Sequence, residues 1–230
     1  MGSAYSRRLV ATSGQWLSGR GAASGPASLP SESSAQCRAG WTRHILAGLN
    51  SHRPALAQRA RDAIPPKLLQ QVEESIAIRW LPFEAHMSVL MALRATLGSD
   101  AYRQLCRTQI LASLRHPALF AKPARTALQL YGAGPFALFR AVPVSLRYIF
   151  RDAGELHIQL TPDGRELRAR YQDFPPCFSQ DDTWSLIWMA TIEALAAYAL
   201  EGQALRAEVA LIEHEPEHGH FEWQASVVPE

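Results

Sequence analysis

The sequence predicts an α+β fold, in which an N-terminal layer of helices packs on an antiparallel sheet made of two hairpins flanking one long buried helix. Residues 41–150 carry apolar side chains at helical spacing, interrupted by Gly and Pro. Residues 154–228 instead contain two pairs of alternating segments, separated by a long apolar run. Strands joined by short turns pair antiparallel, and helices then cover one face of the sheet.

The helical layer is delimited by prolines and glycines. Segment 83–98, for example, places Phe83, Met87 and Leu90 on one face and ends at Gly98. The last segment of the layer contains Pro143, which should kink or split it. The other helical segments are expected at 54–64, 67–76, 100–116, the second half of 117–134, and 135–154.

The first hairpin is predicted in "GELHIQLTPDGRELRARYQDF", where two alternating segments surround an Asp-Gly turn. The second hairpin should pair strands at about 205–213 and 220–228. Between the hairpins, residues 184–200 are apolar almost throughout, which is typical of a buried helix.

Residues 1–40 are expected to form a disordered tail, and residues 41–230 a single domain. The tail is rich in Ser, Gly, Ala, Arg and Pro, so it lacks the apolar surface whose burial would offset the entropy of ordering. This composition is also that of an organelle transit peptide, although a flexible bacterial N-terminus or a mis-chosen start is the favoured interpretation.

The composition favours a cytoplasmic protein. The chain is 47% hydrophobic and 19% charged, and its net charge of +2 does not predict a nucleic-acid-binding surface. No uninterrupted apolar run is long enough for a membrane span. The cysteines Cys37, Cys106 and Cys177 lie far apart, which favours a reducing compartment over a disulfide framework or a thiolate zinc site. No nucleophile elbow, phosphate loop or H-E-x-x-H motif occurs, so no catalytic residue is predicted.

One short stretch gathers potential metal ligands. "LIEHEPEHGHFEW" (211–223) contains His214, His218 and His220, with Glu213, Glu215 and Glu217 beside them. His218 and His220 would point to one face of a strand, and His214 would approach from the paired strand, so three imidazoles would be available to zinc. The Pro and Gly inside the stretch favour a different interpretation, namely the solvated tip of a hairpin.

Glu193 stands in the middle of the apolar helix 184–200 and must be paired or lie at the rim of a cavity. Arg168 or Arg170 from the predicted sheet is the simpler partner, and contact with a ligand is the alternative. Trp184 and Trp188, one helical turn apart, belong to the core or line an apolar pocket.

From Trp41 to its end the chain resembles an uncharacterised family of myxobacterial paralogues, of the domain-of-unknown-function type. The matching stretches are "HILAGL", "RWLPFEAHMSVLMALRATLG", "YGAGPFALFRAVPVSLRYIFRDAGELHI", "RARYQDFP", a helix ending in "LEG" and a last strand with "FEW".

In architecture this family is similar to the 4-vinyl-reductase-type ligand-binding domain, whose fold is shared with haem–nitric-oxide sensor domains and small subunits of the TRAPP tethering complex. The resemblance implies a dimeric binding or sensing module with an apolar pocket between helix 184–200 and its neighbours. The residues predicted for this pocket are Glu193, Trp184, Trp188, Phe139 and Tyr148.

The haem sensors of this fold carry a Tyr-x-Ser-x-Arg motif. In "YIFRDAG" (148–154) Phe150 stands where the serine should be, so the resemblance does not carry haem ligation over to His86 or His116. The sequence therefore predicts no cofactor, neither zinc nor haem, and leaves a small apolar ligand as the expected occupant.

The expected function is that of a non-enzymatic cytoplasmic sensory or signalling module, which binds a small apolar molecule or a protein partner and forms a homodimer. Two alternatives stay open. One is a metal-binding protein, with or without enzymatic activity, that uses His214, His218 and His220. The other is a structural scaffold whose tail, residues 1–40, contacts its partners.

Overall fold

The computed structural model describes residues 34–52, 54–116, 120–132, 134–179, 181–215 and 219–229. Its larger sheet has four antiparallel strands in the order β4-β5-β7-β6. Both predicted hairpins are present, and pairing of β5 with β7 joins them into one sheet, which confirms the α+β class. The strands are β4 (Glu155–Leu160), β5 (Glu166–Gln172), β6 (Leu205–Glu215) and β7 (His220–Pro229).

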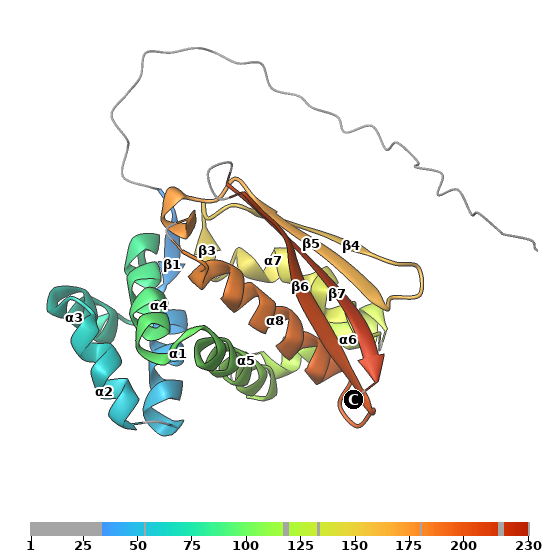
Figure 1. Ribbon diagram of the computed structural model, residues 1–230, viewed down its shortest axis with the longest axis horizontal. Coiled ribbons are helices and arrows are strands. Elements are labelled where there is room, and N and C mark those ends of the chain that lie inside the picture. The colour runs from blue at the N-terminus through green and yellow to red at the C-terminus, as the bar shows by residue number, and fades with distance from the viewer. Residues whose placement is uncertain are drawn as a thin grey trace, which may run out of the picture. The chain divides into compact units, whose positions relative to one another are not determined.

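The long helix α8 (Thr183–Ala199) lies between this sheet and the N-terminal helices (Figure 1). It packs against β6 on one side and against α5 (Ser99–Arg115) on the other. A helix that is apolar around most of its circumference has no face to offer to water, so it is stable only when other elements surround it. This requirement explains why the chain places one helix between two layers.

The N-terminal layer is formed by successive short helices, as the spacing of apolar residues predicts. Proline begins two of them, where its missing N–H is not needed. The helices besides α5 are α1 (Ala39–His52), α2 (Pro54–Ala63), α3 (Pro66–Glu74), α4 (Phe83–Leu97) and α6 (Ala121–Tyr131).

Pro143 interrupts the last helical segment, as predicted. A 3-10 helix, η1 (Ala137–Ala141), runs directly into the five-residue helix α7 (Val142–Leu146), which carries the proline in its first turn. A second 3-10 turn, η2 (Pro176–Ser179), precedes α8. No helix among the described residues is long and apolar enough to cross a membrane.

A second, three-stranded sheet was not predicted. Its order is β2-β1-β3, with β1 (Gln36–Arg38) in the centre, β2 (Trp80–Pro82) and β3 (Phe150–Arg151). Strands of two or three residues are too short for an alternating pattern to be visible. Residues 36–40 thus belong to β1 and the start of α1, whereas the sequence had placed them in the tail. Residues 34 and 35 lead into β1, and residues 1–33 of the predicted tail lie outside the described residues.

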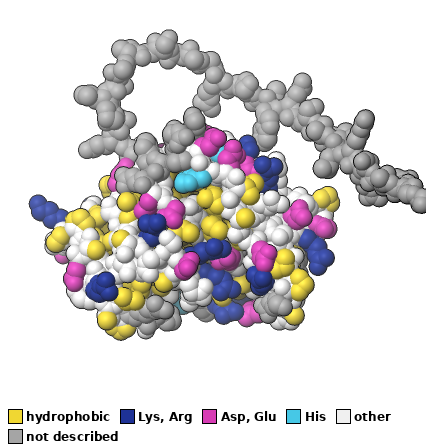
Figure 2. Space-filling view, viewed as in Figure 1, with side chains coloured by type: hydrophobic (Ala, Val, Ile, Leu, Met, Phe, Trp, Pro, Cys, Tyr) yellow, Lys and Arg dark blue, Asp and Glu magenta, His cyan; other side chains and the backbone are white. Residues whose placement is uncertain are grey.

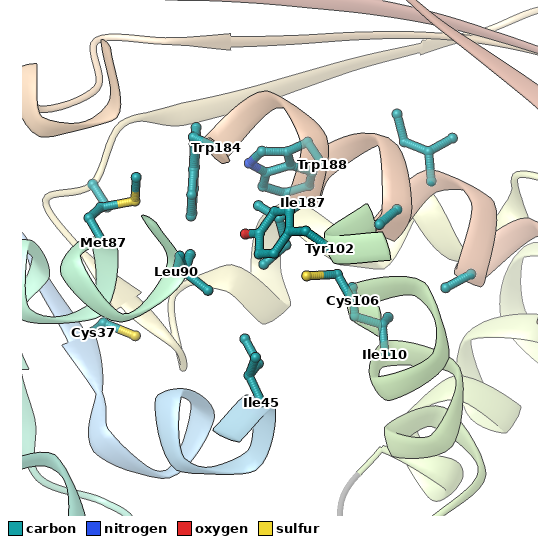
Figure 3. Packing of buried hydrophobic residues seen from close by; sticks show 14 of the residues in the cluster. Cys37, Ile45, Met87, Leu90, Tyr102, Cys106, Ile110, Trp184, Ile187 and Trp188 are labelled. Carbon is teal, nitrogen blue, oxygen red and sulfur yellow. The ribbon is translucent and has the colours of Figure 1, made fainter. Parts of the chain in front are cut away.

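Aromatic side chains fill the space where α4, α8 and the two sheets meet. The Trp184 ring lies 5.3 Å from Phe83 of α4 and 4.3 Å from Phe178, measured between ring centroids. Figure 3 shows Trp184, Ile187 and Trp188 of α8 beside residues of α4 and α5. These rings connect elements that are distant in sequence, so they hold the helical layer to the sheets.

His86 on α4 is part of this aromatic core. It is 1% exposed, and its Nδ1 lies 2.9 Å from the hydroxyl of Thr42. Its Nε2 has no hydrogen-bond partner among the described residues. Burial lowers the pKa of His86 from 6.5 to about 3, so the imidazole is neutral in the folded chain.

Because the unfolded chain binds a proton on His86 below about pH 6.5 and the folded chain does not, this residue removes stability as the pH falls from 6.5 towards 3. We expect it to lower the free energy of unfolding by about 2 kcal/mol between pH 7 and pH 5. His86→Gln should lack this component in urea unfolding measured at both pH values. The control is His157→Gln, which changes a partly exposed histidine. Equal pH dependence in the wild type and His86→Gln would contradict the prediction.

Candidate ligand pocket

An apolar cavity of about 150 Å³ lies inside the helical part of the domain. It is lined by residues of α1, α5, α6, η1, α7, α8 and β3, and it is partly open to the surface. Aromatic rings of Trp41, Trp184 and Trp188 form part of its wall. Aliphatic side chains form most of the rest, including Ile110, Leu114, Leu138, Val142, Leu146, Ile149, Ile187 and Leu195.

The cavity exists because the side chains of α6 that face it are small. Ala124 and Ala127, three residues apart, face the cavity from this helix. Protein interiors are close-packed, and a wall of alanines opposite tryptophan rings on a neighbouring helix leaves volume unfilled unless another group enters. The cavity therefore follows from the pattern of small residues on α6 and large residues on α8.

The hydroxyl groups in the cavity wall are already hydrogen-bonded to backbone carbonyls one helical turn earlier. The hydroxyls of Ser113, Ser145 and Thr191 each donate to the backbone carbonyl four residues earlier, at 2.8, 2.9 and 2.7 Å. The indole N–H groups of Trp184 and Trp188, by contrast, have no hydrogen-bond partner among the described residues. The wall is thus predominantly apolar with two indole donors left to offer, which favours a largely apolar occupant.

One wall residue has a second polar neighbour. The Ser113 hydroxyl lies 2.6 Å from Nε2 of His44 on α1, which is the pairing that activates a serine nucleophile in some hydrolases. Among the described residues, however, no carboxylate bonds to His44 as the third member of a catalytic triad would. The hydroxyl also donates to the carbonyl of Gln109. The pair therefore carries no catalytic assignment.

The cysteines do not supply a nucleophile either. Burial raises the pKa of the Cys106 thiol to about 12. Burial, with a smaller contribution from the Glu84 carboxylate, raises the pKa of the Cys177 thiol to about 12 as well. A thiol is nucleophilic as the thiolate, so both side chains are protonated and inert at neutral pH.

Two of the five residues predicted for the pocket line the cavity, namely Trp184 and Trp188. Phe139 is fully buried but packs against Phe136, with ring centroids 6.3 Å apart, and is not part of the wall. Tyr148 is 73% exposed on the surface. The sequence missed the contributions of α5, α6 and α7, although the alanines at every third position of α6 are a readable signal of a closely approached helix face.

Glu193 also lies outside the cavity. Its carboxylate pairs with the Arg103 guanidinium of α5, and Arg103 Nε lies 3.4 Å from the second carboxylate oxygen. The cavity face of α8 contains Trp184, Trp188 and Thr191, and a residue two positions beyond Thr191 is rotated about 200° around the helix. The predicted partners Arg168 and Arg170 were wrong, because they bind a different glutamate.

The predicted histidine cluster does not converge. His214 stacks on Phe221, with ring centroids 4.8 Å apart, on the face of the sheet that carries Phe221 and Trp223. His220 precedes Phe221 on β7 and therefore points to the opposite face. A register shift between Leu211 and Glu213 marks a bulge in β6. Beyond it His214 pairs with Phe221, and Glu215 pairs with His220, so the two imidazoles lie on opposite faces of the sheet. His218 lies outside the described residues.

A different group forms on the outer face of the sheet. Ligand atoms of Glu213, His220 and Glu222 lie within 4.8 Å of one another, and His220 Nε2 is 3.0 Å from Glu213 Oε2. The Glu222 carboxylate is fully buried and pairs with Arg168 and, at 2.7 Å, with Arg170. Two guanidinium groups on one carboxylate neutralise the charge that a cation would need, so an ion-pair network explains the group without a metal.

Two larger, polar clefts lie between α5, α8 and β6, with volumes of about 450 and 470 Å³. Both are lined by charged groups, and Glu193 contributes to both, while its partner Arg103 lines the smaller one. Figure 2 shows basic and acidic side chains interleaved on this side of the molecule. Exposed pairs such as Arg115 with Glu201 are typical of a solvated surface, so the smaller apolar cavity is the stronger candidate site.

Solved H-NOX domains share the fold of this chain. An Fe(II) unliganded H-NOX protein from K. algicida has a TM-score of 0.55 at 11% identity, with 84% of this chain and 97% of that chain covered. An oxygen-binding H-NOX domain related to soluble guanylate cyclases, solved as its oxygen complex, has a TM-score of 0.54 at 10% identity, with 84% and 96% covered. No protein-family model matches the sequence, and no curated protein is significantly similar to it.

This likeness confirms the predicted resemblance to the haem–nitric-oxide sensor fold, at the level of the fold. The likeness to the myxobacterial family, to the 4-vinyl-reductase-type domain and to TRAPP subunits stays a prediction.

The exclusion of haem was wrong. A third structure of the same fold, of a protein whose haem redox potential is modulated through porphyrin distortion, has a TM-score of 0.53 at 11% identity, with 83% of this chain and 98% of that chain covered. The fold itself therefore accommodates haem.

The residues around the cavity can be compared with what haem requires. Haem iron is held by His, Cys, Met or Tyr side chains. None of these residue types lines the cavity in the described part of the chain, and its volume is below the roughly 300–1,000 Å³ of pockets for larger ligands. The wall as it stands does not fit the group, so no step of the function proposed below goes through haem.

The Glu222 network yields a stability test. Arg168→Ala combined with Arg170→Ala leaves a buried carboxylate without counter-charge and should cost about 3 kcal/mol of unfolding free energy. Adding Glu222→Gln should recover most of this loss, because no buried charge then remains. Glu222→Gln alone should cost only about 1 kcal/mol, since water hydrates the half-exposed arginines.

Chemical denaturation of the four proteins measures these differences. Arg206→Ala is the control, because its partner Glu208 is exposed and the pair should contribute less than about 1 kcal/mol. The interpretation fails if the triple variant is no more stable than the double arginine variant.

Proposed function

We propose that this chain is a non-enzymatic sensory or ligand-binding module that takes a small apolar molecule into the cavity between α1, α5, α6, α7 and α8. The observation that carries the proposal is the cavity wall, in which apolar side chains predominate and the hydroxyls are already bonded to their own helices. The likeness to H-NOX domains supports a fold that surrounds a ligand with protein.

The volume indicates the size of the ligand. A dry apolar cavity of about 150 Å³ is large enough for benzene or xenon. An occupant of about this size would recover the dispersion contacts that the wall side chains lack while the space is empty. The proposed ligand class is therefore a compact molecule without charge, aromatic or aliphatic.

The position of the cavity suggests how binding would be sensed. Its wall includes Trp184 and Trp188 of α8, and the same two rings pack on Tyr171 and Trp223 of the four-stranded sheet. A ligand that binds one arrangement of α6 and α8 more tightly than another shifts the population towards that arrangement. A protein partner or a second copy of the chain would read this shift, and the cytoplasm is the proposed compartment.

A cavity-filling variant tests the proposal. Ala127→Leu places a larger side chain in the space, so it should abolish uptake of benzene or xenon while changing the free energy of unfolding by less than about 1 kcal/mol. In a fully packed core the same change costs about 1–3 kcal/mol. Uptake is measured by calorimetry with benzene and by the NMR shift of dissolved xenon.

The matched control is Ala112→Leu, which makes the same change at an exposed position of α5 and should leave uptake intact. Failure of the wild-type chain to take up either probe would contradict the proposal, as would a strong destabilisation by Ala127→Leu. An absorption spectrum of the purified protein is recorded first. A haem Soret band in this spectrum would contradict the proposed small apolar ligand and identify a porphyrin as the ligand.

A further inference from the structure

Two isoleucines project into solvent from the turn between α3 and β2. Ile76 is 66% exposed and Ile78 is 69% exposed, and both belong to the tripeptide Ile76–Ile78 that precedes Arg79. Two large aliphatic side chains that are this exposed rarely lie close together, because each forgoes the favourable free energy of transfer out of water.

The turn is held in place by the N-terminal end of α1. The backbone N–H of Gly40 donates to the carbonyl of Ala77 at 2.9 Å, and Arg43 donates to the carbonyl of Ser75 at 2.8 Å. A Cβ at position 40 would lie 2.9 Å from the Ala77 oxygen, so glycine is what permits this close approach. The isoleucines are therefore presented by a fixed backbone and cannot fold back into the core.

A second exposed turn lies beside the first. Tyr148, just after α7, is 73% exposed, and its carbonyl accepts a hydrogen bond of 3.4 Å from Arg38 Nε. The same guanidinium donates through Nη1 to the carbonyl of Ile78. One side chain thus holds both turns, which places the tyrosine and the isoleucines on a common surface.

Arginines surround this apolar group. Arg38 and Arg151 stack on the Trp80 ring, at 3.9 and 4.2 Å from its centroid, on the outer face of the small sheet. Figure 1 shows where β1 and β3 of this sheet lie. Arg79 and Arg147 are exposed next to Ile78 and Tyr148. The acidic residues in or beside segments 76–80 and 147–152 include Glu73, Glu74 and Asp152, and Glu73 is already paired with Arg61. The surface is cationic although the chain as a whole is nearly neutral.

From this arrangement we infer that the two turns and the outer face of the small sheet form a docking surface for an anionic lipid bilayer. The isoleucines would enter the apolar boundary of the bilayer, the aromatic rings would lie at the headgroup level, and the arginines would contact lipid phosphates and carboxylates. This surface is separate from the cavity, so the inference does not depend on the proposed function.

The bilayer fits the observations better than other anionic partners do. Nucleic acid receives aliphatic side chains only as wedges between base steps, which must unstack at a cost in free energy. An acidic protein would need carboxylates at positions that match four arginines and a groove for the isoleucines. Lipids move laterally, so their headgroups adapt to any spacing of cations around an inserted apolar tip. Clusters of at least four basic residues are typical of surfaces that bind anionic lipid.

The test is co-sedimentation of the full chain with two kinds of vesicle, one of phosphatidylcholine alone and one of phosphatidylcholine mixed with phosphatidylserine. We expect binding to the mixed vesicles that weakens as salt is added, and much weaker binding to phosphatidylcholine. Arg79→Ala should lower the partition coefficient about fivefold, and so should Arg147→Ala. Ile76→Ser combined with Ile78→Ser should also weaken binding, with its salt dependence unchanged.

Two variants serve as matched controls. Leu130→Ser changes a side chain of α6 that is 72% exposed, and Arg115→Ala changes an exposed arginine of α5, and neither should affect partitioning. Thermal unfolding checks that all variants fold. The inference is overturned if the chain binds neither vesicle, if the patch variants bind as the wild type does, or if the chain binds polyglutamate but no vesicle, which would assign the surface to an acidic protein.

Discussion

The burial of α8 is the constraint on which the rest of the structure depends. Its sequence is apolar around most of the helix, so water is excluded from nearly every side. The four-stranded sheet covers one side, α5 a second, and the aromatic group around Phe83 and Phe178 covers its N-terminal end. The two hairpins on either side of α8 in the sequence must therefore pair with each other, which produces the single sheet.

The same constraint creates the cavity. α8 presents tryptophans towards α6, where alanines stand opposite, and no side chain of the surrounding helices fills the remaining volume. A cavity in this position lies beside α8, so an occupant would contact the helix around which the domain packs. The likeness to H-NOX domains extends over most of the chain, but at 10–11% identity it concerns only the arrangement of helices and strands. The chemistry of the cavity therefore follows from the apolar wall residues of this chain.

Charged groups in this protein serve different purposes according to their surroundings. The Glu222 carboxylate is buried beneath two arginines and is satisfied within the sheet, whereas the arginines around Trp80 have aromatic and backbone contacts but few acidic partners. The first arrangement is complete by itself. The second leaves positive charge and apolar side chains together in solvent, which is why we infer that it binds another molecule.

The sequence by itself determined the fold class, both hairpins, the long buried helix and the break at Pro143, because these depend on local periodicity and on turn residues. It also identified Trp184 and Trp188 as residues of one helix face. The tertiary structure alone decided which groups meet. The partner of Glu193 comes from α5, ninety positions away, and the histidines of the last hairpin separate because the pairing of β6 with β7 places them on opposite faces of the sheet. The small sheet and the cavity wall likewise join segments that no local pattern relates, since contacts between distant elements depend on how whole helices and strands pack.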